Sequence, residues 1–218
     1  MTPPRRILVI RGGAIGDFVL TLPAIKLLRD RFPKADLEIL GNKQIAAVAE
    51  RRFYADAVRP IESGALARFF SNDSELPSEW VDYFASFDLI LSYLFDPDEI
   101  FEGNVKKSGR AEFIAGPFRI DQSEHAARQL ARPLQALGLF LNDPSARTFP
   151  NDIDREAIRS FKKSPGLIAI HPGSGSETKN WPIDRWIELG NLLLAKGGPL
   201  LVIAGEAEID RTRNLKAI

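Results

Sequence analysis

The chain contains no cysteine, only two histidines and no excess of basic over acidic residues. The absence of cysteine excludes disulfide bridges and thiolate metal sites, and two histidines are too few for a multi-histidine metal centre. Lysine plus arginine number 29, as do aspartate plus glutamate, so the chain lacks the basic excess of proteins that coat nucleic acids. Long apolar runs are also missing. We therefore expect no signal peptide, no membrane span and a cytoplasmic protein without a bound metal.

What the sequence does contain is a strand, a glycine-rich turn and a helix near its beginning. Residues 7–10 form an aliphatic run typical of a buried strand. Apolar residues then recur at helical spacing between Leu20 and Leu28. Three glycines lie in the turn between these segments: Gly12, Gly13 and Gly16. This order predicts an α/β domain whose functional site lies at the carboxyl end of the first strand.

Asp17, which follows the last of these glycines, has two interpretations. As a helix cap it would accept hydrogen bonds from backbone N–H groups, and the spacing by itself favours this role. As a general base it would be a carboxylate at a strand end facing a cleft, where the glycines let a substrate approach the backbone closely. A dinucleotide site is disfavoured, because the glycines do not follow the G-x-G-x-x-G spacing and the second strand ends at Gly41 without an acidic residue. A nicotinamide-dependent oxidoreductase is therefore the weaker alternative.

The rest of the first 150 residues alternates between expected strands and expected helices. Further strands are expected at residues 35–41, 57–61, 87–94 and 111–118. Helices are expected at residues 42–50, 63–70, 78–87 and 123–139. Ser78 is the expected cap of the third of these helices, and Gly138 lies near the end of the fourth. Residues 96–109 combine charges with two glycines, which indicates an irregular connection.

The pattern of strand, glycine-rich turn and helix returns after a Pro-, Asn- and Asp-rich linker at residues 141–154. We expect a first domain at residues 1–150 and a second at residues 151–218. The second contains only two clear strands, whereas sheets typically contain five or six. Either these strands extend the sheet of the first domain, or the second domain is incomplete. The usual size of sheets favours an incomplete domain.

The turn of the second unit, His171-Pro-Gly-Ser-Gly-Ser-Glu-Thr-Lys179, is a candidate anion site. It is not a P-loop, because threonine precedes the lysine and asparagine follows it. Backbone N–H groups, two hydroxyls, an ammonium group and a helix start would nevertheless favour a diphosphate. The alternative is an ordinary loop with a solvated lysine. The candidate diphosphate-binding residues are Gly173, Ser174, Gly175, Ser176 and Lys179.

Two stretches resemble one known family. Residues 11–33, RGGAIGDFVLTLPAIKLLRDRFP, resemble the N-terminal signature of glycosyltransferase family 9, which includes the ADP-heptose:lipopolysaccharide heptosyltransferases. Residues 171–193, HPGSGSETKNWPIDRWIELGNLL, resemble the start of the C-terminal, nucleotide-binding domain of that family. The two motifs occur in the family's order and at its separation.

The resemblance implies a GT-B architecture, in which two Rossmann-like domains with parallel sheets face each other across a cleft. It also implies an inverting glycosyltransferase that uses no metal or other cofactor. The acceptor would lie mainly on the first domain, beside Gly12, Gly13 and Gly16, with Asp17 as the base that deprotonates its hydroxyl. Lys179 and the neighbouring loop would stabilise the departing diphosphate on the second domain.

The partners implied by the resemblance are a sugar donor and a sugar acceptor. The donor is a nucleoside-diphosphate sugar, with ADP-heptose as the first choice. The acceptor is a lipid-linked saccharide like the lipopolysaccharide core, so at most peripheral association with the inner face of the cytoplasmic membrane is expected. No nucleic-acid partner is expected.

The chain also departs from the family. Family members continue well beyond this length, through a glycine-rich segment with an H-L-A-A-like stretch that helps to hold the nucleotide. The 218 residues contain no such segment. We therefore expect weak nucleotide binding and little or no transfer by this chain alone. The alternative from another functional class is a catalytically silent α/β fragment that retains only a binding surface.

Overall fold

A computed structural model describes residues 3–72, 75–159, 161, 165–173 and 177–205. The chain divides into two compact units, residues 1–149 and 150–218. This division lies one residue from the boundary that the composition indicates. The roles expected of the two domains remain predictions.

The first unit is built around a five-stranded parallel sheet with the order β3-β2-β1-β4-β5. The apolar runs identified in the sequence supply all five strands, in most cases over a shorter range than expected. Their bounds are β1 (Arg6–Arg11), β2 (Asp36–Gly41), β3 (Ala57–Pro60), β4 (Leu89–Ser92) and β5 (Glu112–Ala115). The predicted α/β fold class with a parallel sheet is therefore confirmed.

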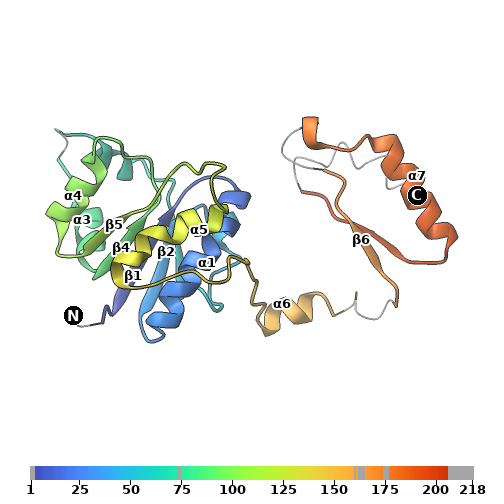
Figure 1. Cartoon of the computed structure of the whole chain (residues 1–218), viewed down its shortest axis with the longest axis horizontal. Coiled ribbons are helices and arrows are strands. Elements are labelled where there is room, and N and C mark those ends of the chain that lie inside the picture. The colour runs from blue at the N-terminus through green and yellow to red at the C-terminus, as the bar shows by residue number, and fades with distance from the viewer. Residues whose placement is uncertain (1–2, 73–74, 160, 162–164, 174–176, 206–218) are drawn as a thin grey trace. The chain divides into compact units, whose positions relative to one another are not determined.

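Helices cover both faces of this sheet, as expected for parallel strands that are buried on two sides. Ile7 and Val9 point to one face, which is covered by α1 (Ile15–Arg31) and α5 (Ala126–Ala131). Figure 1 shows these two helices side by side in front of the sheet. Leu8 and Ile10 point to the opposite face, which is covered by α3 (Ser78–Ala85) and α4 (Ile100–Ser108). The alternation follows from the two-residue side-chain period of a strand.

The prediction of an irregular connection at residues 96–109 is wrong, because this segment contains α4. Both oxygens of the Asp96 carboxylate accept backbone hydrogen bonds, from Phe101 N at 3.0 Å and from Glu102 N at 2.9 Å. Phe101 and Val105 are buried one turn apart on the helix. The charged residues between them hid this pattern in the sequence.

The prediction that Ser78 caps α3 is also wrong. Pro77 occupies the N-cap position, with extended backbone angles, and Ser78 is the first helical residue. The expected helix at residues 123–139 is present as two pieces, α5 followed by the 3₁₀ helix η2 (Arg132–Leu137). Gly138 ends the second piece at φ +73°, as a glycine does at a helix end. The two short helices expected earlier correspond to α2 (Lys43–Ala46) and η1 (Leu66–Phe70).

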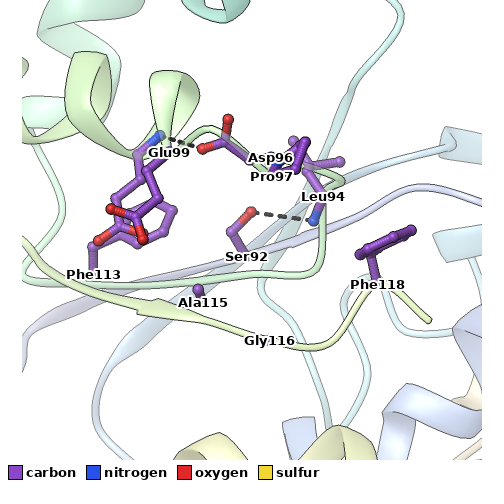
Figure 2. Close-up of a pocket in the computed structure, with 10 residues that line it drawn as sticks. Ser92, Leu94, Asp96, Pro97, Glu99, Phe113, Ala115, Gly116 and Phe118 are labelled. Carbon is purple, nitrogen blue, oxygen red and sulfur yellow. Dashed lines mark hydrogen bonds between the residues drawn. The ribbon is translucent and has the colours of Figure 1, made fainter. Parts of the chain in front are cut away.

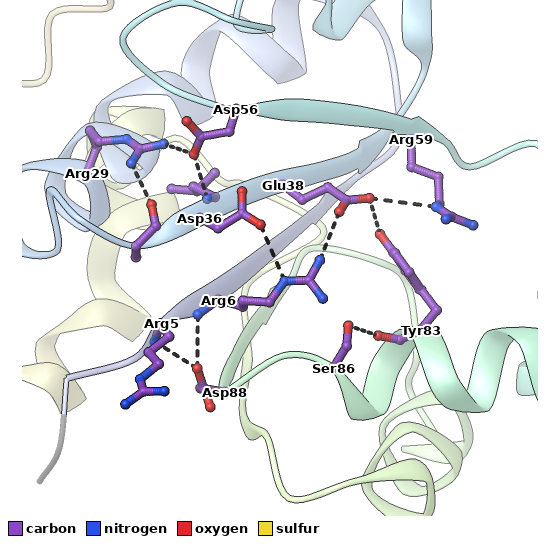
Figure 3. A network of polar contacts seen from close by, with 12 residues as sticks. Arg5, Arg6, Arg29, Asp36, Glu38, Asp56, Arg59, Tyr83, Ser86 and Asp88 are labelled. Atoms are coloured by element: carbon purple, nitrogen blue, oxygen red, sulfur yellow. Dashed lines mark hydrogen bonds and ion pairs between the residues drawn. The ribbon is translucent and has the colours of Figure 1, made fainter.

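The amino ends of the strands are joined by charged groups (Figure 3). The Glu38 carboxylate on β2 accepts a hydrogen bond from the Tyr83 hydroxyl at 2.9 Å and pairs with Arg6 at 3.5 Å. Arg59 on β3 lies 3.6 Å from the same carboxylate. The Asp88 carboxylate accepts the backbone N–H of Arg6 at 2.9 Å. These contacts fix α3 and the strands β1, β2 and β3 against one another at the edge opposite Asp17.

The second unit begins with α6 (Asp152–Ala157) and has its own two-stranded parallel sheet. The sheet pairs β6 (Ile168–Ile170) with β7 (Leu200–Val202), and the chain between them forms η4 (Glu177–Lys179) and α7 (Ile183–Ala195). Within the described residues these two strands do not join the sheet of the first unit, so that alternative is wrong. The sequence also predicts a last polar helix that runs to Ile218, and residues 206–218 lie outside the described residues.

Candidate functional site

The carboxyl edge of the five-stranded sheet contains a switch point between β1 and β4. The chain leaves β1 towards β2 on one side, whereas β4 and β5 lie on the other. Ligands of open parallel sheets bind in the crevice that such a reversal creates outside the strand ends. The segments at this point are the Gly12–Gly13 turn after β1 and Tyr93–Leu94 after β4. Asp17 is the third residue of α1, directly behind the turn.

Asp17 is both a cap and an accessible carboxylate. One oxygen, Oδ2, accepts the backbone N–H of Ala14 at 3.1 Å, so the residue stabilises the first turn of α1. The side chain is nevertheless 47% exposed. Thr21 supports the same turn from inside, because its hydroxyl donates to the Asp17 carbonyl at 2.8 Å. The two interpretations of Asp17 are therefore geometrically compatible.

Arg11 is the residue that the sequence interpretation missed. Its side chain is only 8% exposed, and its Nη2 lies 3.7 Å from Asp17 Oδ1 and 3.4 Å from the Asp17 carbonyl oxygen. The guanidinium also lies over the Tyr93 ring, 5.4 Å from its centroid. Burial lowers the pKa of Arg11 from its usual value, and the charge of Asp17 opposes this effect. The signal that could have indicated it is a charged residue at the carboxyl end of β1, directly after four apolar residues.

The three glycines of the turn have different roles. Gly13 has φ +93°, and a Cβ atom there would lie 2.8 Å from Asp17 Oδ2. Only glycine allows both this backbone conformation and the position of the carboxylate. A Cβ at Gly12 would meet Leu94 at an ordinary 3.8 Å, and at Gly16 it would meet nothing within 4 Å. The close approach to Asp17 is therefore specific to Gly13.

Tyr93 connects the turn to the rest of the first unit. It is buried, and its hydroxyl donates to the Leu130 carbonyl of α5 at 2.7 Å. Burial raises the pKa of Tyr93, and the nearby charge of Arg11 opposes the shift. A Cβ at Gly116, after β5, would lie 2.4 Å from the Tyr93 ring. Tyr93 thus fixes the exit of β5 as well as the Arg11 side chain.

A pocket of about 170 Å³ opens at the carboxyl ends of β4 and β5. Figure 2 shows Ser92 and Ala115 on its floor, Phe113 on one side and Phe118 on the other. Leu94 also lines the pocket, and a Cβ at Gly12 would meet its side chain at 3.8 Å, so the pocket adjoins the glycine turn. The sequence interpretation did not anticipate this pocket, because its walls come from segments that are separated along the chain.

The candidate diphosphate residues of the second unit are only partly described. Gly173 is half-buried and follows β6 after the exposed His171 and the buried Pro172. Lys179 is exposed at the end of η4, in the same connection between β6 and α7. Ser174, Gly175 and Ser176 lie outside the described residues. The 3₁₀ turn η4 between the loop and α7 was not expected from the sequence.

The tryptophans and the first histidine have local roles. Trp181 and Trp186 pack edge to face at the start of α7, with ring centroids 5.3 Å apart. The sequence favours a solvated helix face for His125; the residue is exposed, and its Nδ1 also caps α5 by accepting the Ala127 N–H. The sequence offers Arg6 as a contact for an anionic acceptor, with a merely solubilising charge as the favoured alternative; in the structure it belongs to the ion-pair network at the amino ends of the strands. It therefore lies at the opposite edge from Asp17.

The described residues contain no group of three or more histidine or acidic side chains placed to hold a metal ion. In the same part of the chain, no helix has the length and apolar character needed to cross a membrane.

No protein-family model and no curated protein matches the sequence. Solved structures do match its fold. The chain superposes on a glycosyltransferase family 9 protein from Veillonella parvula with a TM-score of 0.69 at 17% identity, covering 98% of this chain and 66% of that one. It superposes on Escherichia coli ADP-heptose lipopolysaccharide heptosyltransferase II with a TM-score of 0.66 at 14% identity, covering 98% and 69%.

A third match is E. coli heptosyltransferase WaaC, solved with ADP-2-deoxy-2-fluoro heptose. The TM-score is 0.63 at 15% identity, covering 96% of this chain and 72% of that one. The chain therefore spans about two thirds of the length of these structures, and over that span it has the fold of glycosyltransferase family 9 proteins and heptosyltransferases.

Proposed function

We propose that the chain is part of an inverting glycosyltransferase that requires no metal. It transfers a sugar, with heptose as the first choice, from a nucleoside diphosphate to a lipid-linked saccharide like the lipopolysaccharide core. Residues 1–150 form the acceptor-side domain, and residues 151–218 begin the domain that binds the nucleotide sugar. The protein works in the cytoplasm, at most peripherally associated with the inner face of the membrane.

The observation that carries this proposal is the position of Asp17. A half-exposed carboxylate stands at the switch point of a parallel sheet, and one of its oxygens is fixed by the Ala14 N–H at 3.1 Å. The matching fold of glycosyltransferase family 9 structures supports the assignment. Such a carboxylate can take the proton of an acceptor hydroxyl that approaches over the glycine turn.

The reaction then follows as one displacement. Asp17 removes the hydroxyl proton as the acceptor oxygen attacks the anomeric carbon of the donor. The bond from that carbon to the diphosphate breaks on the opposite face, so the configuration is inverted. Negative charge develops on the departing diphosphate, and the ammonium group of Lys179 with the N–H groups of the Gly173 loop stabilises it. Arg11 keeps positive charge beside Asp17.

ADP-heptose is the proposed donor because one protein of related fold was solved with this kind of ligand, in two structures. E. coli heptosyltransferase WaaC was solved with ADP and with ADP-2-deoxy-2-fluoro heptose. The exposed Lys179 between β6 and α7 supports an anion site on this unit. Lys179→Met should weaken ADP binding about tenfold, whereas Lys196→Met, which removes an exposed lysine after α7, should leave it unchanged.

The test is a sugar-transfer assay in which the chain is in excess over ADP-heptose, so that weak turnover is still measurable. The acceptor is a deacylated lipopolysaccharide core, and ADP release is followed. Asp17→Asn keeps an oxygen for the Ala14 N–H but removes the base, so we expect transfer to fall by about 10²-fold or more. The folded fraction, measured by circular dichroism, should not change.

Asp36→Asn is the matched control, because Asp36 is a half-exposed aspartate at the opposite edge of the sheet. It should transfer within about twofold of the unchanged chain. Transfer by Asp17→Asn at the full rate would refute the assignment of Asp17 as the base. Absence of acceptor-dependent ADP release from the unchanged chain would favour the catalytically silent fragment.

A further inference from the structure

The pocket beside the glycine turn contains a buried hydroxyl group at its floor. Ser92 is only 3% exposed and lines the pocket (Figure 2). Its oxygen accepts a weak hydrogen bond from Leu94 N at 3.3 Å, and within the described residues its own proton has no acceptor. A buried hydroxyl that still has a proton to donate is suited to a ligand oxygen.

One wall of the pocket is an aromatic ring that packs against a second ring outside the lining. Phe118, which is 41% exposed, lines the pocket and contacts Phe95, which is 56% exposed, with ring centroids 4.2 Å apart. Two exposed phenylalanines in contact form an apolar surface beside a cavity whose lining is partly polar and partly apolar. The flat apolar face of a sugar ring can pack on such a surface while its hydroxyls reach the cavity floor.

The charge of the pocket is negative. Among its lining residues none is basic, and three are acidic: Asp96, Glu99 and Glu102. Asp96 is used in capping α4, and Glu102 pairs with Lys106 at 2.5 Å. Glu99 makes no side-chain hydrogen bond with any described residue; the Lys106 ammonium group interacts with its charge but bonds to Glu102, so Glu99 is the carboxylate that can still accept from a ligand. An anionic ligand would be repelled here, whereas hydroxyl or ammonium groups would be accepted.

We propose that this pocket binds one sugar ring of the acceptor, and that the ring carries hydroxyl or amino groups and no negative charge. The volume of about 170 Å³ fits one ring and is below that of ordinary ligand pockets, which is roughly 300–1,000 Å³. The identification of this sugar as part of the acceptor rests on the proposed function. The proposal refines that function, because it specifies a neutral or amino sugar next to the site of attack.

The experiment is a titration of the isotopically labelled full chain by nuclear magnetic resonance, without any donor. The probes are the methyl glycosides of glucosamine, glucose and glucuronic acid, each up to about 50 mM, above the millimolar dissociation constants measurable in this way. We expect shifts at the backbone amides of Leu94, Gly116 and Phe118. Glucosamine should bind more tightly than glucose, and glucuronate should not bind.

Two variants separate the charge from the aromatic surface. Glu99→Gln should weaken glucosamine binding about fivefold and change glucose binding by less than about twofold. Phe118→Ala should weaken the binding of both sugars. Glu75→Gln and Phe140→Ala are the matched controls, because both residues are exposed and lie outside the pocket lining. The controls should bind like the unchanged chain.

The proposal is overturned if glucuronate binds as tightly as glucosamine, if the shifts lie away from the pocket, or if no probe binds. It is also overturned if Glu99→Gln leaves the preference for glucosamine intact. The probe titration involves no transfer step, so the unchanged chain reports binding and transfer separately. A failure of transfer with normal probe binding would therefore refute the proposed function and leave the sugar pocket in place.

Discussion

Arg11 Nη2 lies 3.7 Å from Asp17 Oδ1, and the two side chains differ sharply in exposure. The guanidinium is buried against Tyr93 and its Nε has no hydrogen-bond partner among the described residues, whereas the carboxylate is half-exposed. A buried charge without its counterion is destabilising. The pair therefore couples the stability of the turn to the residue proposed as the base.

This coupling can be measured by a double-mutant cycle with Arg11→Met and Asp17→Ala. We expect a coupling free energy of about 0.5–1 kcal/mol, at the low end for contacting residues because water screens the exposed carboxylate. Urea unfolding of the four proteins gives the value. Lys26 and Asp30, an exposed pair on α1, provide the control cycle with an expected ~0.3–0.5 kcal/mol. A smaller coupling for Arg11–Asp17 than for this control would contradict the structure.

Gly13 and Gly16 should respond oppositely to alanine. Gly13→Ala forces a side chain into φ +93° and against Asp17 Oδ2, so we expect a loss of roughly 1–3 kcal/mol in the free energy of unfolding. Gly16→Ala adds a methyl group in open space within the first turn of α1 and should stabilise by up to about 1 kcal/mol. Thermal denaturation of both variants provides the comparison. Equal effects at the two positions would show that the turn is not held as described.

Gly116→Ala tests the packing of β5 against Tyr93. The new Cβ would lie 2.4 Å from the ring, and Tyr93 is held by its hydrogen bond to Leu130. We expect a destabilisation of about 1–3 kcal/mol, typical of overpacking. Gly64→Ala, where a Cβ meets nothing within 4 Å, is the matched control and should change stability by less than about 0.5 kcal/mol. Chemical denaturation measures the free energy of unfolding of both variants. If Gly116→Ala is as stable as Gly64→Ala, the contact between Gly116 and Tyr93 is excluded.

The three tyrosines should not titrate normally in the folded chain. Burial raises the pKa of Tyr54, of Tyr83 and of Tyr93, and the Glu38 charge raises that of Tyr83 further. Their stabilising contribution is therefore complete below the unfolded value of about 10 and is lost as the pH rises above it. We expect tyrosinate absorbance to appear only together with alkaline unfolding, followed by circular dichroism. Ionisation near pH 10 without loss of structure would contradict the burial of these rings.

The sequence and the structure agree best where the signal is local. The aliphatic run before Arg11 and the glycines before Asp17 predict a strand, a turn and a helix, and each of these is present. The expected break near Gly138 is also found, because a glycine end depends on a few neighbouring residues. By contrast, the helix α4 was missed. Its N-cap residue, Glu99, makes no capping hydrogen bond, its first N–H groups are held by the more distant Asp96, and charges interrupt its apolar face.

The sequence by itself determined the α/β class, the parallel strands and the placement of Asp17 at the start of a helix, because periodicity and turn chemistry act between near neighbours. Only the tertiary structure decided what surrounds Asp17. Arg11 meets Tyr93, and Ser92 lies beneath Phe113 and Phe118, through strand pairings between segments far apart in the chain. Burial and charge at the candidate site arise from these long-range contacts, and no short stretch of sequence contains them.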